Sequence, residues 1–450
     1  MVDIQDLAEK LVTRALRLGA DACDVAAVSS SVVVAEMERG SVKQASTIRD
    51  TGVGIRVFRK GSPGFACATG TEMGRALKAL ELAVSQARAG TPDPAFKDLP
   101  RPGRATRTSG LYDRRVADLQ PAEVVEMAIE LTDAARTHAK IYSVNAGISA
   151  GSCQAAFCNS NGITRRQSFT AFEIGAESVA KDGEVMFSGM DASWSRRLQK
   201  SEVVRVGQTA SSYAMRGLRR TRIPTGDYAV VLDPIAAGHI LATAIGGGAN
   251  ADNVQRGRSY LGGKVGKAVG VDSLTVWDDP TVDWLSGSFS FDGEGTPARR
   301  KAVIERGVLR SLLHDSYTAG KDCVRSTGNS SRGGALWSYR RPPSIAPSNL
   351  IVSRGDSSLD EMLEETRRGV YLRVTYDHPN LATGEFSGMM MESFVIQDGA
   401  LGDSILQSTI GIDLLEMYRR IDLMSRETRY AFGVSVPYMR VSRARIGGSA

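Results

Sequence analysis

The sequence has few of the side chains that bind metals or catalyse hydrolysis. Only four histidines and five cysteines occur among its 450 residues. No two histidines lie close enough in sequence to share a helix face, as the helical zinc motif of metal-dependent hydrolases requires. The cysteines are odd in number and lack C-x-x-C spacing, which argues against a disulfide framework and a zinc knuckle. A metal site assembled from distant histidines and cysteines is the alternative that spacing leaves open.

Long apolar runs are also absent. No window approaches the length of a membrane-spanning helix, about 18 apolar residues. The opening segment MVDIQDLAEKLVTRAL is amphipathic and contains acidic residues, and it lacks the basic and apolar regions of a signal peptide. We therefore expect a soluble cytoplasmic protein that does not associate with a membrane.

Charge of one sign is not in large excess. Lysine and arginine number 56 against 50 aspartates and glutamates, a formal charge of +6, and the arginine clusters are scattered along the sequence. Nucleic-acid binding needs a contiguous basic face, so we expect no nucleic-acid partner. Hydrophobic residues at 42% and charged residues at 24% are typical of a globular protein. Because one hydrophobic core rarely grows beyond about 250–300 residues, the length predicts two domains.

Apolar periodicity predicts how the first half is organised. Two hairpins with turns at Arg39-Gly40 and at residues 61–64 are followed by a meander that turns at Asn161-Gly162 and Asp182-Gly183. Helices are expected over residues 4–16, 72–89, 121–139 and 201–218. We predict an N-terminal α+β domain of helix-plus-antiparallel-hairpin units over residues 1–221, with a proline-containing linker at about 90–110.

The second half is expected to contain mostly short strands. It begins with a buried strand at residues 228–232 and a helix at 234–245. Further strands are expected at residues 274–277, 288–291, 301–304, 308–313, 349–352, 370–375 and 392–396, and helices at 358–368 and 411–421. Helices and strands come in blocks rather than in βαβ alternation, which indicates the α+β class. We predict a mainly antiparallel β domain with flanking helices over residues 222–450.

The residue patterns alone predict no catalytic centre. The glycine run at residues 246–248 follows a predicted helix, whereas phosphate-binding loops precede one, so it is interpreted as a flexible helix end. Serines are frequent, but none lies in a G-x-S-x-G elbow between a predicted strand and a predicted helix, so no serine nucleophile is indicated. Asp292 and Glu294 have the chemistry for acid–base catalysis, but they lie among turn residues, which favours solvated turn carboxylates.

Several segments, in order, resemble the TldD/PmbA family, known as modulators of DNA gyrase and as a heterodimeric zinc metalloprotease. The most specific is FDGEGTPARRKAVIERGVLRSLLHDSYTAGKD at residues 291–322. Further matches are Ser326-Thr327-Gly328-Asn329, Thr383-Gly384-Glu385-Phe386-Ser387 and, in the first half, Gly52-Val53-Gly54-Ile55-Arg56-Val57. The resemblance covers nearly the whole chain.

The resemblance also implies which subunit this is. The protease-type subunit carries an H-E-x-x-x-H helix and a cysteine ligand near its C-terminus. Matching on Arg256-Gly257-Arg258-Ser259 places residues 242–247 over that helix and Phe432-Gly433 over the cysteine, and no ligand is found at either place. This chain therefore resembles the PmbA/TldE-type subunit, with no catalytic residue, metal or cofactor of its own.

Such a subunit is expected to pair with a TldD-type subunit that holds the zinc. An extended peptide would enter a channel at the heterodimer interface, where antiparallel sheet edges would bind its main chain. Two alternatives remain open: a specialised amidase or peptidase pair in natural-product biosynthesis, and a standalone homo-oligomeric binding protein without protease activity. The candidate channel or interface residues are His239, Gly246, Gly247, Gly248, Arg256, Ser259, Asp292, Glu294, Arg299 and Arg300.

Three of these candidates carry a more specific expectation. Arg299 has the geometry to bind a substrate carboxylate through two parallel hydrogen bonds. Surface solvation is the competing account of this arginine. Asp292 and Glu294 would otherwise serve only to fix the turn that enters the following hairpin.

Overall fold

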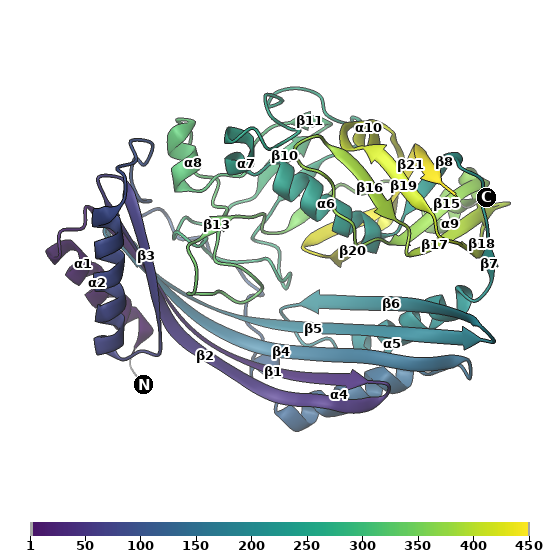
Figure 1. Ribbon diagram of the computed structural model, residues 1–450, viewed down its shortest axis with the longest axis horizontal. Helices are drawn as coiled ribbons and strands as arrows, with labels where there is room; N and C mark the ends of the chain where they lie inside the picture. Colours follow the sequence, from purple (N-terminus) through teal and green to yellow (C-terminus); the bar gives the residue numbers. More distant parts are fainter. Residues whose placement is uncertain (1–2, 449–450) are drawn as a thin grey trace.

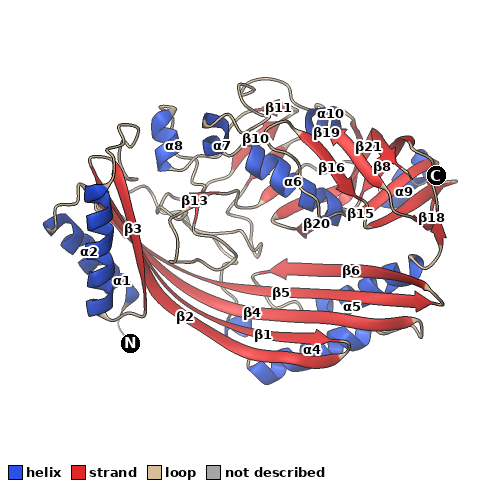
Figure 2. Ribbon diagram, viewed as in Figure 1, coloured by secondary structure: helices blue, strands red, loops and turns tan. Residues whose placement is uncertain are grey.

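The computed structural model describes residues 3–448, in which helices and antiparallel strands form separate blocks (Figures 1 and 2). The predicted α+β class is confirmed. In the first half the elements are α1 (Ile4–Arg17), β1 (Ala22–Glu38), β2 (Ser41–Arg59), β3 (Ser62–Thr69), α2 (Met73–Ala89), α3 (Arg114–Ala117), α4 (Pro121–Ala134), β4 (Ile141–Asn159), β5 (Thr164–Asp182), β6 (Val185–Ser195) and α5 (Lys200–Arg216).

The strands of the first half form one antiparallel sheet in the order β3-β2-β1-β4-β5-β6. The predicted hairpins and meander are joined because β1 pairs with β4 along most of its length. Four strands were expected before α2, but β2 runs unbroken from one turn to the next and serves both hairpins. Gly52 and Gly54 do not turn the chain. A Cβ on either would lie within 2.5 Å of Tyr339, so these glycines admit that residue against the strand.

Helices cover only one face of this sheet. The odd-numbered residues of β1, such as Val25 and Ala35, pack in the cores formed with α1, α2, α4 and α5. Since successive strand residues point to opposite faces, Glu36 and Glu38 lie on the other face. Figure 1 shows that this second, concave face is turned toward the C-terminal half.

The C-terminal half is built on a second, larger sheet. Its elements are β7 (Arg220–Thr221), β8 (Gly226–Leu232), α6 (Pro234–Gly248), α7 (Ala251–Gln255), β9 (Val276–Asp278), β10 (Lys301–Glu305), β11 (Val308–Leu309), α8 (Ser316–Lys321), β12 (Ser330–Ser331), β13 (Ser344–Ile345), β14 (Leu350–Val352), α9 (Leu359–Thr366), β15 (Arg368–Val374), β16 (Glu385–Met389), β17 (Glu392–Gln397), β18 (Ala400–Ile405), β19 (Thr409–Asp413), α10 (Leu414–Arg419), β20 (Ile421–Ala431) and β21 (Val434–Gly447).

Three details of this half differ from the expectation. The sheet is mixed, because β8–β15, β14–β21 and β7–β18 pair in parallel. The strand expected at residues 288–291 is a loop, in which the buried Ser288 hydroxyl donates to the Val282 carbonyl. The helix expected over 411–421 begins only at Leu414, because Asp413 ends β19 and caps the helix through the Glu416 amide.

Helix α6 lies in the core of the C-terminal half. Asp233 caps it by accepting from the Ile235 amide, and Pro234 occupies its first turn, as is common at helix starts. The helix is apolar nearly all round and packs with β15, β20 and β21. None of the helices of residues 3–448 is long and apolar enough to cross a membrane.

The chain passes from one sheet to the other close to the predicted boundary. Helix α5 belongs to the first sheet, and β7, a few residues later, already pairs with β18 of the second. The division into residues 1–221 and 222–450 stays a prediction.

A buried ion network joins the two halves. Arg373 of β15 is 1% exposed and contacts the carboxylates of Asp191 at 3.0 Å and Glu392 at 2.5 Å. Asp191 of β6 is fully buried and also pairs with Arg205 of α5 at 2.9 Å and Arg429 of β20 at 2.7 Å. The edge strand of the first sheet is therefore tied to two strands of the second.

Removing Arg373 is expected to destabilise the protein strongly. Among the described residues, Arg373→Met leaves the buried Glu392 without a cationic partner and removes one of the three arginines that contact Asp191. Breaking a buried pair in this way typically costs about 3–5 kcal/mol. Arg426→Met is the matched control, since Arg426 pairs with Glu361 at 3.2 Å with both side chains more than half exposed. That change should cost under about 1 kcal/mol. Urea unfolding measures both, and equal losses would contradict the account.

Candidate functional site

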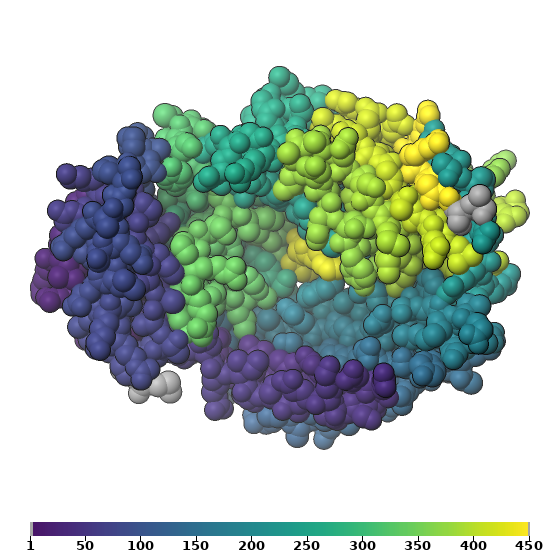
Figure 3. Space-filling view, viewed as in Figure 1, coloured from purple at the N-terminus to yellow at the C-terminus, as the bar shows by residue number. Residues whose placement is uncertain are grey.

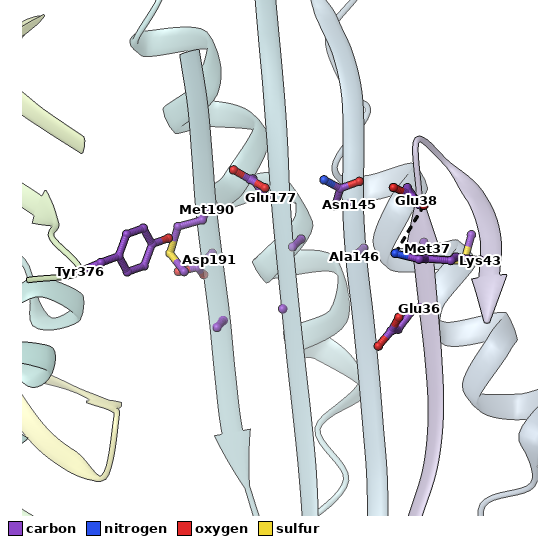
Figure 4. A pocket seen from close by; sticks show the side chains of 13 residues that line it. Glu36, Met37, Glu38, Lys43, Asn145, Ala146, Glu177, Met190, Asp191 and Tyr376 are labelled. Carbon is purple, nitrogen blue, oxygen red and sulfur yellow. Dashed lines mark ion pairs between the residues drawn. The ribbon is translucent and has the colours of Figure 1, made fainter. Parts of the chain in front are cut away.

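A cleft lies between the concave face of the first sheet and the C-terminal half. In Figure 3 the sheet is recessed beneath the C-terminal half. One pocket of this cleft has a volume of about 500 Å³ and is shown in Figure 4. Its lining is Glu36, Met37, Glu38, Lys43, Asn145, Ala146, Gly175, Ala176, Glu177, Met190, Asp191, Ala192 and Tyr376. Only Tyr376 comes from the C-terminal half, and Figure 4 shows it reaching toward β6.

One row of residues across the floor of the cleft carries almost no side chains. Gly147 of β4 lies opposite Gly175 of β5, which in turn lies opposite Ala192 of β6. A Cβ on Gly175 would meet nothing within 4 Å. A second pocket of about 480 Å³ lies at the edge of β6, between α5 and residues 283–285 and 427–430, and it shares no lining residue with the first. An extended chain can therefore lie across these strands without meeting bulky groups.

Carboxylates line the walls of the cleft. Glu36, Glu38 and Glu177 border the pocket, and only Glu38 has an ion pair among the described residues, with Lys43 at 3.5 Å. Burial raises the pKa of nearby Glu173 above its ordinary value. The pocket lining as a whole contains four carboxylates and one lysine, a formal charge of −3, although Asp191 is paired with arginines outside the lining.

The edge of β6 is partly closed. Arg373 donates to the Met190 carbonyl at 2.6 Å, Glu392 accepts from the Met190 amide at 2.7 Å, and Arg429 donates to the Ala192 carbonyl at 2.7 Å. These backbone groups already form hydrogen bonds with side chains of the C-terminal half. A peptide cannot add to the sheet at Met190 to Ala192, so the expected edge capture does not apply there.

Two histidines meet beside α6. The ring of His239 lies 4.6 Å from that of His378 and 5.2 Å from that of Phe432, and Thr243 Oγ1 lies 3.1 Å from His378 Nδ1. Phe432 also contacts Trp194 of β6 at 5.1 Å. The Nε2 atom of His239 is buried and has no hydrogen-bond partner. Burial, and then the neighbouring His378, lower the pKa of His239.

This cluster occupies the place where the resemblance puts the zinc ligands. A catalytic zinc needs three protein ligands and an open position. Thr243 and Phe432 offer no nitrogen, sulfur or carboxylate donor beside the two imidazoles. Throughout residues 3–448, no group of three histidine, cysteine or acidic side chains is arranged to hold a metal ion. The residues present at α6 do not fit a catalytic zinc.

The glycine run lies inside α6, not beyond its end as expected. A Cβ on Gly246 would meet Pro347 at 2.9 Å, one on Gly247 would meet Leu381 at 2.6 Å, and one on Gly248 would meet Tyr260 at 2.7 Å. These glycines admit neighbouring segments against the helix. The Ser259 hydroxyl then donates to the Gly248 carbonyl at 2.6 Å and helps to end the helix.

Asp292 and Glu294 are not solvated turn carboxylates; that expectation is wrong. Both are at most 1% exposed. Glu294 pairs with Arg56 of β2 at 2.7 Å, and Arg56 also holds Asp24 of β1 at 2.6 Å. Burial, and then the charge of Glu294, raise the pKa of Asp292 to about 7. Glu294, Arg56 and Asp24 form a second buried joint between the halves, whereas Asp292 accepts from the amides of Glu294, Thr296 and Ser330 within the C-terminal half.

The remaining predicted candidates lie on the outer surface. Arg256 pairs with Asp252 one helical turn away, at 2.8 Å. Arg300 lies over the Trp277 ring at 4.4 Å, and Arg299 donates to the Ser326 carbonyl at 3.0 Å. None of these arginines lines the cleft pockets.

The predicted candidates therefore occupy three separate places. His239 and the glycines belong to α6, and Ser259 contacts the end of this helix. Asp292 and Glu294 are buried in one turn, from which Glu294 reaches the joint, and the arginines lie on the surface. The cleft residues Glu36, Glu177 and Tyr376 were missed. The polar and apolar alternation of β1 is the signal that marks Glu36 as facing away from the helices.

Three family models match this chain. They are described as PmbA/TldA metallopeptidase domain 1, the central domain and the C-terminal domain, and they match residues 23–90, 114–218 and 225–448. Together they cover most of the sequence. The chain belongs to the PmbA/TldD metallopeptidase family.

Individual relatives are consistent with this assignment. A metalloprotease of Methanothermobacter thermautotrophicus is 29% identical over 95% of both chains. A metalloprotease TldD homolog of Buchnera aphidicola is 28% identical over 50% of this chain and 49% of its own. TldE from Thermococcus kodakarensis has the same fold, with a TM-score of 0.89 and 21% identity, covering 98% of this chain and all of that one.

The histidine pair predicts a measurable titration. We expect the His239 imidazole to titrate below its ordinary pKa of about 6.5. His378→Asn should raise the midpoint of His239, because the substitution removes the repulsion from the neighbouring imidazole. The midpoint should still lie below the ordinary value, because His239 remains buried. NMR signals of the His239 imidazole, followed against pH in the unchanged protein and in the His378→Asn protein, report the two midpoints. An unchanged His239 midpoint in the His378→Asn protein would contradict the assigned contact.

The same titration affects stability. The folded protein binds fewer protons at His239 than the unfolded chain, so the free energy of unfolding should decrease as pH falls below about 6.5. His239→Phe should reduce that decrease.

Proposed function

We propose that this chain is the TldE-type, non-catalytic subunit of a heterodimeric zinc metallopeptidase. A TldD-type partner supplies the zinc and hydrolyses the amide bond. This chain contributes a cleft that holds extended peptide near the partner's catalytic centre.

The residue set around α6 carries this proposal. His239 and His378 are accompanied there by Thr243 and Phe432, a set too small for a catalytic zinc. Family membership supports a role in peptide hydrolysis, and the residues of this chain support a role without metal. The proposal therefore assigns the chemistry to the partner.

The cleft supports a role in holding substrate. Its row of glycines leaves room for a main chain, and two of its four carboxylates, Glu36 and Glu177, have no ion pair among the described residues. The two buried joints keep the sheet and the C-terminal half at a fixed separation. A cleft with rigid walls binds a peptide with less loss of entropy than a flexible one.

Metal content and activity test the proposal. We expect the purified chain to contain no stoichiometric zinc and to hydrolyse no unfolded protein or leader peptide. Co-expression with the TldD-type subunit should give a stable pair with one zinc and peptidase activity, and His239→Ala with His378→Ala should leave that zinc in place. Zinc-dependent hydrolysis by this chain alone would contradict the proposal.

Two other outcomes would redirect it. Hydrolysis confined to a small-molecule amide or a single leader peptide would indicate the specialised amidase pair. A stable homo-oligomer that ignores the partner would indicate the standalone binding protein.

Filling the cleft should impair the pair. Gly175→Leu places a side chain above the cleft floor, where a Cβ meets nothing within 4 Å, so the fold should tolerate it. We expect peptide hydrolysis to fall at least about tenfold with zinc retained. Gly411→Leu in β19 is the matched control, because its Cβ is also free and it lies outside the cleft lining. Equal activity of the two variants would contradict a role of the cleft in holding substrate.

A further inference from the structure

A basic band lies on the outer surface, where residues 97–109 cross between the two halves. A cavity of about 1190 Å³ is lined mainly by residues 97–106, 296–299 and 316–326. A neighbouring cavity of about 620 Å³ is lined by residues 105–109, 164–166 and 290–291. The two share Ala105 and Thr106, so they form one continuous groove.

Cations dominate this groove. Asp98 is the one carboxylate in the two linings. The cations are Lys97, Arg101, Arg104, Arg107, Arg165, Arg166, Arg299 and Arg325. Eight cations and one carboxylate give the groove a formal charge of +7, whereas the whole chain carries +6. The positive charge that is scattered in the sequence is thus collected on one surface by the fold.

Most of this charge is not neutralised within the chain. Among the described residues, Arg101 pairs with Asp98 at 3.2 Å and Arg166 with Asp3 at 3.4 Å, and the other six cations have no carboxylate within 4 Å. Arg165 has a buried Nε atom without a hydrogen-bond partner. Uncompensated like charges held close together repel one another, so an anionic ligand would relieve an electrostatic cost.

We propose that this groove binds an extended acidic segment of a polypeptide. Apolar groups lie between the cations, among them Pro100, Pro102, Pro297 and Val324, and they suit the side chains and main chain of a peptide. Nucleic acid is disfavoured because Phe291, the one aromatic side chain in the two linings, is 2% exposed and cannot stack on a base.

The groove is separate from the cleft. Arg165 and Glu177 lie on the same strand, and the residues between them span about 40 Å at about 3.3 Å each. The proposal therefore does not rest on the proposed protease role. Arg101 and Arg107 span about 20 Å if the chain between them is extended, which matches an acidic segment of about six residues.

Fluorescence anisotropy with the full chain tests this proposal. The probe is a labelled octapeptide of alternating glutamate and alanine, and the comparison peptide has glutamine in place of glutamate. We expect saturable binding of the acidic peptide, at least about tenfold weaker binding of the glutamine peptide, and loss of affinity with added salt, because the cations are exposed.

Charge reversal locates the site. Arg104→Glu with Arg325→Glu should weaken binding at least about tenfold, and both side chains are exposed, so the fold should persist. Arg14→Glu with Lys78→Glu is the matched control, because these residues are exposed on α1 and α2 and form no ion pair with another described residue. That pair should stay within about twofold of the unchanged protein.

Three results would overturn the proposal. One is equal binding of the glutamine peptide, and another is equal weakening by the control pair. The third is tighter binding of a single-stranded oligonucleotide of matched charge that is lost in the Arg104→Glu, Arg325→Glu protein, since the groove would then bind phosphate backbone instead.

Discussion

The contact between Asp191 and Arg373 is the interaction on which the arrangement of the two halves depends. A carboxylate on the edge strand of one sheet and a guanidinium on a strand of the other are both almost fully buried. Burying two charges costs several kcal/mol each, and that cost is offset only when every partner is in place. Glu392, Arg205 and Arg429 complete the set. This network therefore fixes one relative position of the halves more than it adds net stability.

A second buried joint acts at the other end of the curved sheet. Arg56 pairs with Asp24, which like Arg56 belongs to the first half, and with Glu294 of the second half. With both ends held, the concave face cannot collapse onto the C-terminal half, and the cleft between the joints stays open. The glycines of the floor and the carboxylates of the wall therefore border a space of fixed width. The same side chains that fix the halves also occupy the β6 edge, which directs a ligand onto the sheet face.

Local patterns predicted what depends on neighbours in sequence, and they failed where distant segments meet. Helix α6 was predicted from its proline start and apolar residues, and the turn at Arg39-Gly40 from its glycine. Asp292 and Glu294 do lie in a turn, but nothing in the sequence marks them as buried. Arg56, which pairs with Glu294, lies more than 200 residues away, and Asp292 accepts from the amide of Ser330 beyond its own turn. His378 gave no signal at all, because only the fold brings it to His239. The family resemblance rested on several segments that occur in the same order along the chain. A match at one site alone would not have been enough to recognise it.

The central claim is that this chain shapes a peptide cleft and that its partner holds the metal. Zinc anomalous scattering from a crystal of the assembled pair tests it most directly. The account predicts one strong peak in the partner subunit and none near α6 of this chain. A zinc peak within bonding distance of His239 or His378 would contradict it.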